Sequence, residues 1–316
     1  MLRSVSFPPE IEPSPADLLL INPSAGGGAA LAAAGPLREF AERRGWRVEP
    51  RLTTSAAELT QLAKEGVCEG RRRIFVLGGD GTFQDVANAV GAHSGVVLGI
   101  LPAGGGNDLA QALGLPNDPI HAAEMLLSGA PRPMDTVRYA AADGRTRFYL
   151  GGGGLGLDAR AAEFANTSYR RLRGRMRYIA AALHALAGFR PLRVRATLES
   201  GEPRELDVEA LVFGVLNTPS YGGGVKLAPG AKIDDGKLDV VLVKPLNLWE
   251  IARALPGLAL HGELRSSRVE RWSATRVRIQ VEGGAMFHGD GEILGPTPIS
   301  LEIVPEAFRV QAPAAR

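Results

Sequence analysis

The sequence contains a single cysteine, Cys68, among its 316 residues. One cysteine excludes an internal disulfide framework and any zinc site built from several cysteines. The formal net charge is only +2, too small to indicate a nucleic-acid-binding protein. No apolar run approaches the ~18 residues that a membrane-spanning helix needs, and residues 1–15 lack the apolar core of a signal peptide. We therefore expect a cytoplasmic protein, at most peripheral on the inner face of the membrane.

Two familiar nucleotide-binding motifs are also missing. The sequence has no glycine loop that ends in Gly-Lys-Ser or Gly-Lys-Thr. It also has no spaced glycine triad followed by an acidic residue about twenty positions later. A P-loop enzyme and a dehydrogenase are therefore disfavoured. Glycine itself is abundant, with 40 residues gathered in short turns, which indicates many loops defined by their backbone.

The first half of the sequence alternates between strand and helix patterns. Buried strands are predicted at residues 17–21, 46–52, 73–77 and 96–101, separated by helical stretches such as 29–44, 55–65 and 119–127. This alternation predicts a parallel sheet. Three of the four strands end in turns rich in glycine, asparagine or aspartate, at residues 22–28, 78–82 and 102–110. Because the carboxyl ends of parallel strands meet at one edge, these turns are expected to line one crevice.

The turn Gly78-Gly79-Asp80-Gly81-Thr82 lies between a buried strand and a helix. Glycines at a helix N-terminus allow backbone amides to approach a phosphate, and the helix dipole favours its charge. Asp80 would repel that phosphate unless a metal or another cation lies between them. Alone, the motif could be an ordinary turn in which Asp80 caps the helix. The three turns together favour a polyphosphate site.

The second half contains short strand patterns that follow one another without long helices. They lie at residues 134–139, 147–150, 192–198, 205–216, 237–243, 276–281 and 299–304, with one helical segment near 172–186. Such a pattern predicts an antiparallel β-sandwich, so we divide the chain into an α/β domain at 1–132 and a sandwich domain at 133–304. A cluster of basic residues precedes and enters the helical segment. It contains Arg170, Arg171, Arg173, Arg175 and Arg177. The cluster could be a solvated helix face or a patch for anionic lipid headgroups.

Two late segments contain candidate chemical groups. Asp234 and Asp235 precede a glycine, and such a turn can coordinate Mg²⁺ or Ca²⁺, although it is also an ordinary turn sequence. Asp290 and Glu292 flank Gly291 and suit one metal-associated group and one proton acceptor. The same segment would be unremarkable as a hairpin turn.

These motifs, in this order, resemble the diacylglycerol kinase catalytic-domain family, specifically the bacterial lipid kinases related to sphingosine kinases. The resemblance rests on Asn22-Pro23-Ser24, Gly78-Gly79-Asp80-Gly81-Thr82, Pro102-Ala103-Gly104 with Asn107-Asp108, Asp234-Asp235-Gly236-Lys237-Leu238, and Asp290-Gly291-Glu292. The Gly-Gly-Asp-Gly-Thr turn is shared with NAD kinases and phosphofructokinases, so it indicates only the superfamily. The Asp-Gly-Glu segment and the Pro-Ala-Gly turn make the lipid-kinase assignment more specific.

The resemblance implies an ATP-dependent lipid kinase that transfers the γ-phosphate to a lipid hydroxyl, on a diacylglycerol- or sphingosine-like substrate. It implies an α/β nucleotide-binding domain with a parallel sheet and an antiparallel β-sandwich domain, with the active site between them. The C-terminal tail, from about residue 305 to 316, would return to the first domain. The family also implies a lipid partner. The arginine cluster from Arg170 to Arg177 indicates a peripheral membrane surface. Nucleic acid is not expected, and a homodimer through the sandwich edges is left open.

The resemblance also assigns roles to residues. Nucleotide-binding residues would be Asn22, Pro23, Ser24, Ala25, Gly26, Thr53, Gly79, Asp80, Gly81, Thr82 and Gly105. Glu292 would be the general base, Asp80 would act with the catalytic Mg²⁺, and Asp290 would belong to the catalytic group. A structural Mg²⁺ would be held by Asp235 with the backbones of Lys232 and Lys237.

The sequence departs from the family at Gly105, where relatives usually carry a threonine after Pro-Ala-Gly. One missing hydrogen bond to the nucleotide would cost about 1 kcal/mol, which weakens ATP binding without abolishing catalysis. Residue 85 is aspartate where glutamate is more usual, and this keeps the negative charge. Two alternatives therefore stay open: an NAD kinase-like enzyme, and a non-catalytic relative that binds a lipid or a nucleotide.

Overall fold

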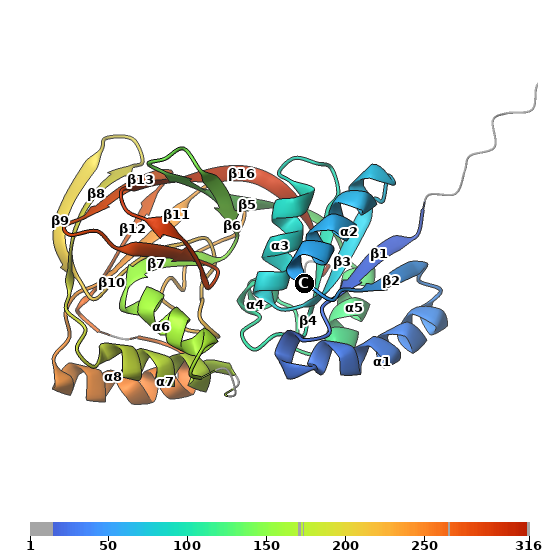
Figure 1. Ribbon diagram of the computed structural model, residues 1–316, viewed down its shortest axis with the longest axis horizontal. Coiled ribbons are helices and arrows are strands. Elements are labelled where there is room, and N and C mark those ends of the chain that lie inside the picture. Colours follow the sequence, from blue (N-terminus) through green and yellow to red (C-terminus); the bar gives the residue numbers. More distant parts are fainter. Residues whose placement is uncertain (1–14, 170–171, 173, 265, 315–316) are drawn as a thin grey trace, which may run out of the picture.

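The computed structural model describes residues 15–169, 172, 174–264 and 266–314, and it has two lobes that lie side by side (Figure 1). The first lobe contains β1 (Asp17–Ile21), the 3-10 turn η1 (Ala25–Gly27), α1 (Ala29–Arg44), β2 (Val48–Leu52), α2 (Ala56–Cys68), β3 (Arg73–Gly78), α3 (Asp80–Val90), β4 (Val97–Pro102), α4 (Asp108–Ala112) and α5 (Pro119–Leu127). Its four strands are parallel, in the order β2-β1-β3-β4. The predicted parallel α/β sheet is confirmed.

The second lobe is built mainly from antiparallel strands. Its elements are β5 (Ala130–Ala141), β6 (Thr146–Tyr149), β7 (Gly152–Gly156), α6 (Leu157–Asn166), α7 (Gly174–Leu186), β8 (Leu192–Glu199), β9 (Arg204–Ala210), β10 (Val212–Leu216), β11 (Leu238–Val243), α8 (Leu248–His261), β12 (Val269–Ala274), β13 (Arg276–Val281), β14 (Met286–Gly289), β15 (Glu292–Pro296) and β16 (Ile299–Ala312). One sheet has the order β12-β11-β10-β7-β14-β15, and it packs on the extended part of the other. The large side chains between the sheets include Tyr149, Phe213 and Phe287. The expected antiparallel sandwich is confirmed.

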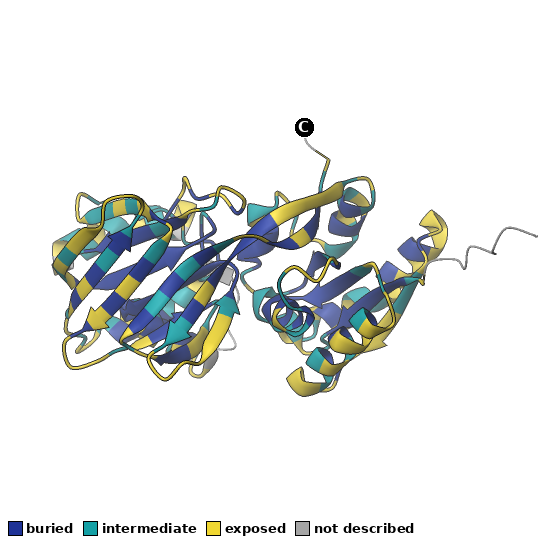
Figure 2. Ribbon diagram, turned by 90° about the horizontal axis from the view of Figure 1, so that it is seen from above, coloured by how far each residue is buried: buried dark blue, intermediate teal, exposed yellow. Residues whose placement is uncertain are grey.

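The strands β5 and β16 run through both lobes. β16 pairs with β13 near its start, at Arg276 and Glu302, and lies parallel to β4 near its end, at Val97 and Arg309. The two lobes therefore share one continuous sheet, with β16 between β4 and β13. The strands of the second lobe alternate between buried and exposed residues, as one solvated sheet face requires (Figure 2).

Several parts of the second lobe differ from the sequence prediction, and one is helix α6, which lies outside the helical segment expected near residues 172–186. Helix α8 lies between β11 and β12, in a region where only strands were expected. Asn247 and Glu250 form a capping box at its start, and Pro256 inside the helix weakens the helical pattern. Residues 205–216, predicted as one strand, form two strands that belong to different sheets.

Candidate active site

The turns that follow β1, β3 and β4 pack backbone against backbone. Gly26 has a φ of 62°, and a Cβ there would lie 2.1 Å from the carbonyl oxygen of Ala103. A Cβ on Gly104 would lie 2.6 Å from the Cα of Gly79. Larger residues would push the turns apart, so these glycines are needed for the close approach. The turns are thus brought together at one edge of the sheet.

The expected nucleotide-binding residues lie on or beside these turns. The Nδ2 of Asn22 donates to the Oγ1 of Thr82 at 2.9 Å, and its Oδ1 accepts from the Oγ of Ser24 at 2.8 Å. The buried Thr53 donates to the carbonyl of Ile21. Among the described residues, no side chain caps the start of α3. The first backbone amides of this helix can therefore donate hydrogen bonds to a bound anion. Of the remaining residues, Pro23 and Ala25 belong to the first turn, and Gly79, Asp80, Gly81 and Gly105 line a cavity described below.

Asp80 is half-buried at the start of α3, and its carboxylate is already bound by backbone amides. It accepts hydrogen bonds of 3.0 Å from the amides of Asp108 and Leu109. Burial and the negative charge of Asp108 raise the pKa of Asp80 to about 7. Asp80 therefore fixes the start of α4. A cation beside this acidic pair would relieve the repulsion between its carboxylates, so the pair suits Mg²⁺.

Asp108 connects the two lobes. It accepts from the Oγ of Ser220 at 2.9 Å and from the amides of Gly223 and Gly224 at 2.8 and 2.7 Å. Ser220, Gly223 and Gly224 follow β10 in the second lobe, whereas Asp108 begins α4 in the first. One buried carboxylate thus fixes the position of the second-lobe loop against the phosphate-side turns.

The segment Asp290-Gly291-Glu292 is the turn of the hairpin β14–β15. Asp290 accepts from the amides of Leu150, Gly151 and Gly152 at 2.7–3.0 Å, so it holds the hairpin in place. The side chain of Glu292 is 47% exposed, and its Oε2 lies 3.9 Å from the Nη1 of Arg147. Glu292 therefore keeps hydrogen-bonding capacity for a ligand.

Asp85 is a site residue for which the sequence assigned no role. It lies on α3 in the first lobe, and burial together with the negative charge of Glu292 raises its pKa from 3.8 to about 6. The two carboxylates thus interact across the lobes. The sequence indicated only that position 85 keeps a negative charge.

Asp85→Asn is expected to increase stability at neutral pH and to decrease activity. The folded-state pKa of Asp85 lies above its ordinary value, so the wild type loses stability as the pH rises from about 4 to about 6. Because Asp85 is partly exposed, we expect the variant to gain only about 1 kcal/mol at pH 7.5 and nothing at pH 4. Urea unfolding at both pH values measures this. An equal gain at pH 4 would contradict the assigned cause.

The expected structural metal site lies apart from this crevice. Lys232, Asp235 and Lys237 are exposed on the loop before β11, and Asp235 accepts from the amide of Lys237 at 3.1 Å. Burial and the charge of Asp235 raise the pKa of Asp239 to about 6. No three acidic, histidine or cysteine side chains of the described chain are close enough to hold a metal unaided. The carboxylates suit Mg²⁺ if backbone carbonyls, waters or phosphates complete its shell.

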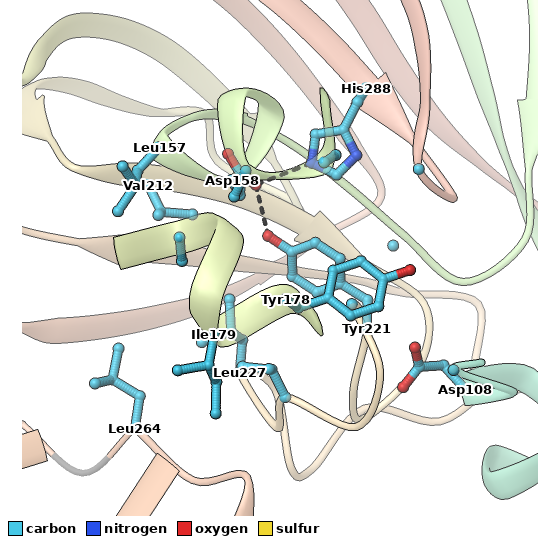
Figure 3. Close-up of a pocket in the computed structure, with 18 of the residues that line it drawn as sticks. Asp108, Leu157, Asp158, Tyr178, Ile179, Val212, Tyr221, Leu227, Leu264 and His288 are labelled. Atoms are coloured by element: carbon cyan, nitrogen blue, oxygen red, sulfur yellow. Dashed lines mark hydrogen bonds and ion pairs between the residues drawn. The ribbon is translucent and has the colours of Figure 1, made fainter. Parts of the chain in front are cut away.

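A cavity of about 480 Å³ connects the crevice to the interior of the second lobe. It is lined by the carboxylates Asp80, Asp108, Asp290 and Glu292 and by apolar residues from α6, α7, α8 and the sheet. Figure 3 shows Asp108 on one side of the cavity and Leu157 and Leu264 on the other. The apolar residues include Leu157, Ile179, Val212, Leu227, Leu258 and Leu264. A cavity with a polar mouth and an apolar depth suits an amphipathic ligand.

A polar cluster, in which His288 is buried and Asp158 and Tyr221 are half-buried, interrupts the apolar wall. The hydroxyl of Tyr221 donates to the Oδ2 of Asp158 at 2.5 Å, and the Nε2 of His288 lies 3.1 Å from the same oxygen. These residues come from β14, the start of α6 and the loop after β10, and all three face the cavity (Figure 3). Their distance in the sequence explains why the motifs gave no sign of the cluster.

Two family models cover most of the chain. Residues 17–139 match the "Diacylglycerol kinase catalytic domain", and residues 153–312 match the "YegS C-terminal NAD kinase beta sandwich-like domain". A Mycobacterium tuberculosis protein named "Diacylglycerol kinase" is 32% identical over 93% of this chain and 94% of the relative. The chain belongs to the diacylglycerol kinase catalytic-domain family. Membership confirms the enzyme class expected from the sequence, a lipid kinase.

Other members of the diacylglycerol kinase family agree with this assignment. A Bacillus subtilis protein, also named "Diacylglycerol kinase", is 31% identical over 83% of this chain and 84% of the relative. A solved structure of a diacylglycerol kinase from Bacillus anthracis str. Sterne has a TM-score of 0.69 and 22% identity, covering 94% of this chain and 96% of that one. The structural likeness supports the fold.

The proposed arginine patch is only partly described. Arg170, Arg171 and Arg173 lie outside the described residues, as does the side chain of Arg175. Arg177 is half-buried, and its Nε donates to the carbonyl of Ala165 at 2.8 Å. In the described part of the chain, no helix is long and apolar enough to cross a membrane.

Proposed function

We propose that this protein is an ATP-dependent kinase that transfers the γ-phosphate to the hydroxyl of a membrane lipid, either diacylglycerol-like or sphingosine-like. The observation that carries the proposal is the continuous cavity, which joins the amide-rich turns and acidic mouth to an apolar chamber. A phosphate donor suits one end, and a hydrocarbon chain suits the other.

Each part of the site has a role in this proposal. The turns around Asn22–Gly26 and Gly79–Thr82 would hold the ATP phosphates, with Thr53 and Gly105 beside the nucleotide. Glu292 takes the proton of the lipid hydroxyl, and Asp290 positions the hairpin that carries Glu292. Mg²⁺ beside Asp80 would neutralise the transferring phosphate, and a second Mg²⁺ at Asp235, with the backbones of Lys232 and Lys237, would stabilise its loop.

The test is a transfer assay with radiolabelled ATP and Mg²⁺, offered either NAD or a lipid extract. We expect the label in the organic phase, with product identification by mass spectrometry. Label on NAD would support the NAD kinase alternative, and no transfer to either acceptor would support a non-catalytic relative.

The same proposal includes peripheral binding to the cytoplasmic face of a membrane, through α8. This helix is apolar on both sides: Ile251, Leu255 and Leu258 line the cavity, while Trp249 and Leu260 face outward. Large apolar side chains that stand exposed together on one helix are often covered by a partner, and a bilayer would bury Trp249 and Leu260. Helices α7 and α8 lie together along one side of the second lobe, so the cavity would open close to the lipid (Figure 1).

Replacing Trp249 and Leu260 together with serine is expected to weaken binding to anionic lipid vesicles at least tenfold. These side chains are 86% and 75% exposed. Burying each of them in the bilayer would contribute about 2 kcal/mol to the binding free energy. Vesicle sedimentation measures the loss. The matched control is Leu31→Ser with Leu52→Ser, because these leucines are 51% and 53% exposed on the first lobe. An equal loss in the control would contradict docking through α8.

A further inference from the structure

Tyr178 and Tyr221 both line the cavity, but their hydroxyls differ in what they contact. The hydroxyl of Tyr221 donates to Asp158, whereas no group of the described residues forms a hydrogen bond with the hydroxyl of Tyr178. Tyr178 is half-buried, and its hydroxyl is not one of the buried polar atoms that lack a partner, so it stays accessible from the cavity. This hydroxyl is therefore available to a ligand.

Tyr178 is the polar end of an otherwise apolar helix face. The residues of α7 that line the cavity follow one another at spacings of three or four along one side of the helix: Tyr178, Ile179, Ala182, Leu183 and Leu186. Among these five, the Tyr178 hydroxyl is the only polar side-chain group, and Leu186 lies about 12 Å further along the helix axis. A hydrocarbon chain that lies along this face would therefore have its polar end beside Tyr178.

The hydroxyl of Tyr178 faces the carboxylates of the site. Figure 3 shows the hydroxyl of Tyr221 turned to Asp158 and that of Tyr178 turned the other way, to the side on which Asp108 lies. Burial raises the pKa of the Tyr178 hydroxyl, and the charges of Asp108 and Asp80 raise it further, against the opposing charge of Arg177. The hydroxyl is therefore protonated at neutral pH and can donate a hydrogen bond. It lies where the acidic part of the cavity meets the apolar part.

A lipid at this position would place beside Tyr178 the group that joins its reacting hydroxyl to its hydrocarbon chain. In an acylglycerol that group is an ester, whose carbonyl oxygen accepts hydrogen bonds and cannot donate them. We propose that the hydroxyl of Tyr178 donates a hydrogen bond to an ester carbonyl oxygen of the lipid and thereby determines specificity. This inference rests on the proposed lipid-kinase function and narrows its substrate to acylglycerols. A site built to pair with one polar group discriminates against analogues that lack it.

Two lipids test the inference because they differ only in their carbonyl groups: a 1,2-diacylglycerol and the 1,2-dialkylglycerol of the same chain lengths. We expect Tyr178→Phe to lower kcat/KM about tenfold for the diacyl lipid, the effect of one hydrogen bond, and to change it less than about twofold for the dialkyl lipid. Phenylalanine keeps the ring, so the cavity wall should stay intact. Tyr139→Phe is the control, since its hydroxyl is unpaired but lies outside this cavity, and it should leave both values unchanged.

The outcomes separate the inference from the proposed function. No loss in Tyr178→Phe, or an equal loss with both lipids, would overturn it, and an equal loss would indicate that the hydroxyl contacts another group, such as the phosphate. If the wild type phosphorylates neither lipid, the proposed function fails, and the same pair is compared by displacement of a fluorescent lipid. A preference for the diacyl lipid that Tyr178→Phe removes would then still support the contact. Equal displacement by the two lipids, or none by either, would refute it.

Discussion

Glu292→Gln is expected to lower kcat for lipid phosphorylation by a factor of roughly 10²–10⁴, while the KM for ATP stays within about twofold. Glutamine keeps the size of the side chain but cannot take the proton of the lipid hydroxyl. Glu292 has a loose contact with Arg147, and Asp290, not Glu292, holds the hairpin through backbone amides. The substitution should therefore leave the fold intact.

Steady-state kinetics with a defined lipid measure this effect, and far-UV circular dichroism checks the fold. Glu282→Gln serves as the matched control because Glu282 is an exposed carboxylate in the turn after β13. The control should retain wild-type kcat. If Glu292→Gln keeps more than about a tenth of wild-type kcat, then another group accepts the proton, and Asp85 is the next candidate.

The phosphate-side turns could be predicted because their signal is local. The residues of Gly78–Thr82 and Pro102–Gly106 follow buried strands directly, so the rule that parallel strands end at one edge places them together. The structure adds the reason for the glycines, which is the close packing of Gly26 on Ala103 and of Gly104 on Gly79. Short-range sequence patterns were therefore sufficient to predict the phosphate-side half of the site.

The lipid side could not be predicted in the same way because its residues come from distant segments. Asp158, Tyr221 and His288 are separated by 63 and 130 residues in the pairs that contact each other. Only the folded sandwich brings them to one wall. Helix α8 was also missed, because Pro256 and Gly257 lie inside it and such residues normally interrupt a helix.

The long strand β16 was predicted only in part, at residues 299–304. Pro305 and Glu306 interrupt its pattern, and Glu306 has a φ of 50°, so the pairing with β5 shifts between Val304 and Phe308. The strand continues because Asp135 of β5 accepts from the amide of Glu306 at 2.8 Å. The contact links residues that are 171 positions apart, so no local sequence pattern could predict that the strand continues.

Asp108→Asn is expected to reduce kcat at least about a hundredfold and to lower the free energy of unfolding by about 3 kcal/mol. The Asp108 carboxylate accepts from Ser220, Gly223 and Gly224 across the lobes. An amide would place an N–H group against these donors and leave some of them unpaired. The loop that contains Tyr221 would then shift, and the lipid wall would lose its alignment with the phosphate-side turns.

Two further variants show whether the effect comes from this contact between the lobes. Ser220→Ala removes one of the three hydrogen bonds, so it should cost only about 1 kcal/mol and reduce kcat much less. Asp118→Asn changes an exposed carboxylate that caps α5 through the amide of His121, and it should leave kcat unchanged. Urea unfolding and lipid-kinase kinetics are measured on all three. Wild-type kcat in Asp108→Asn, or equal losses in Asp118→Asn, would show that contact between the lobes through Asp108 does not align the site.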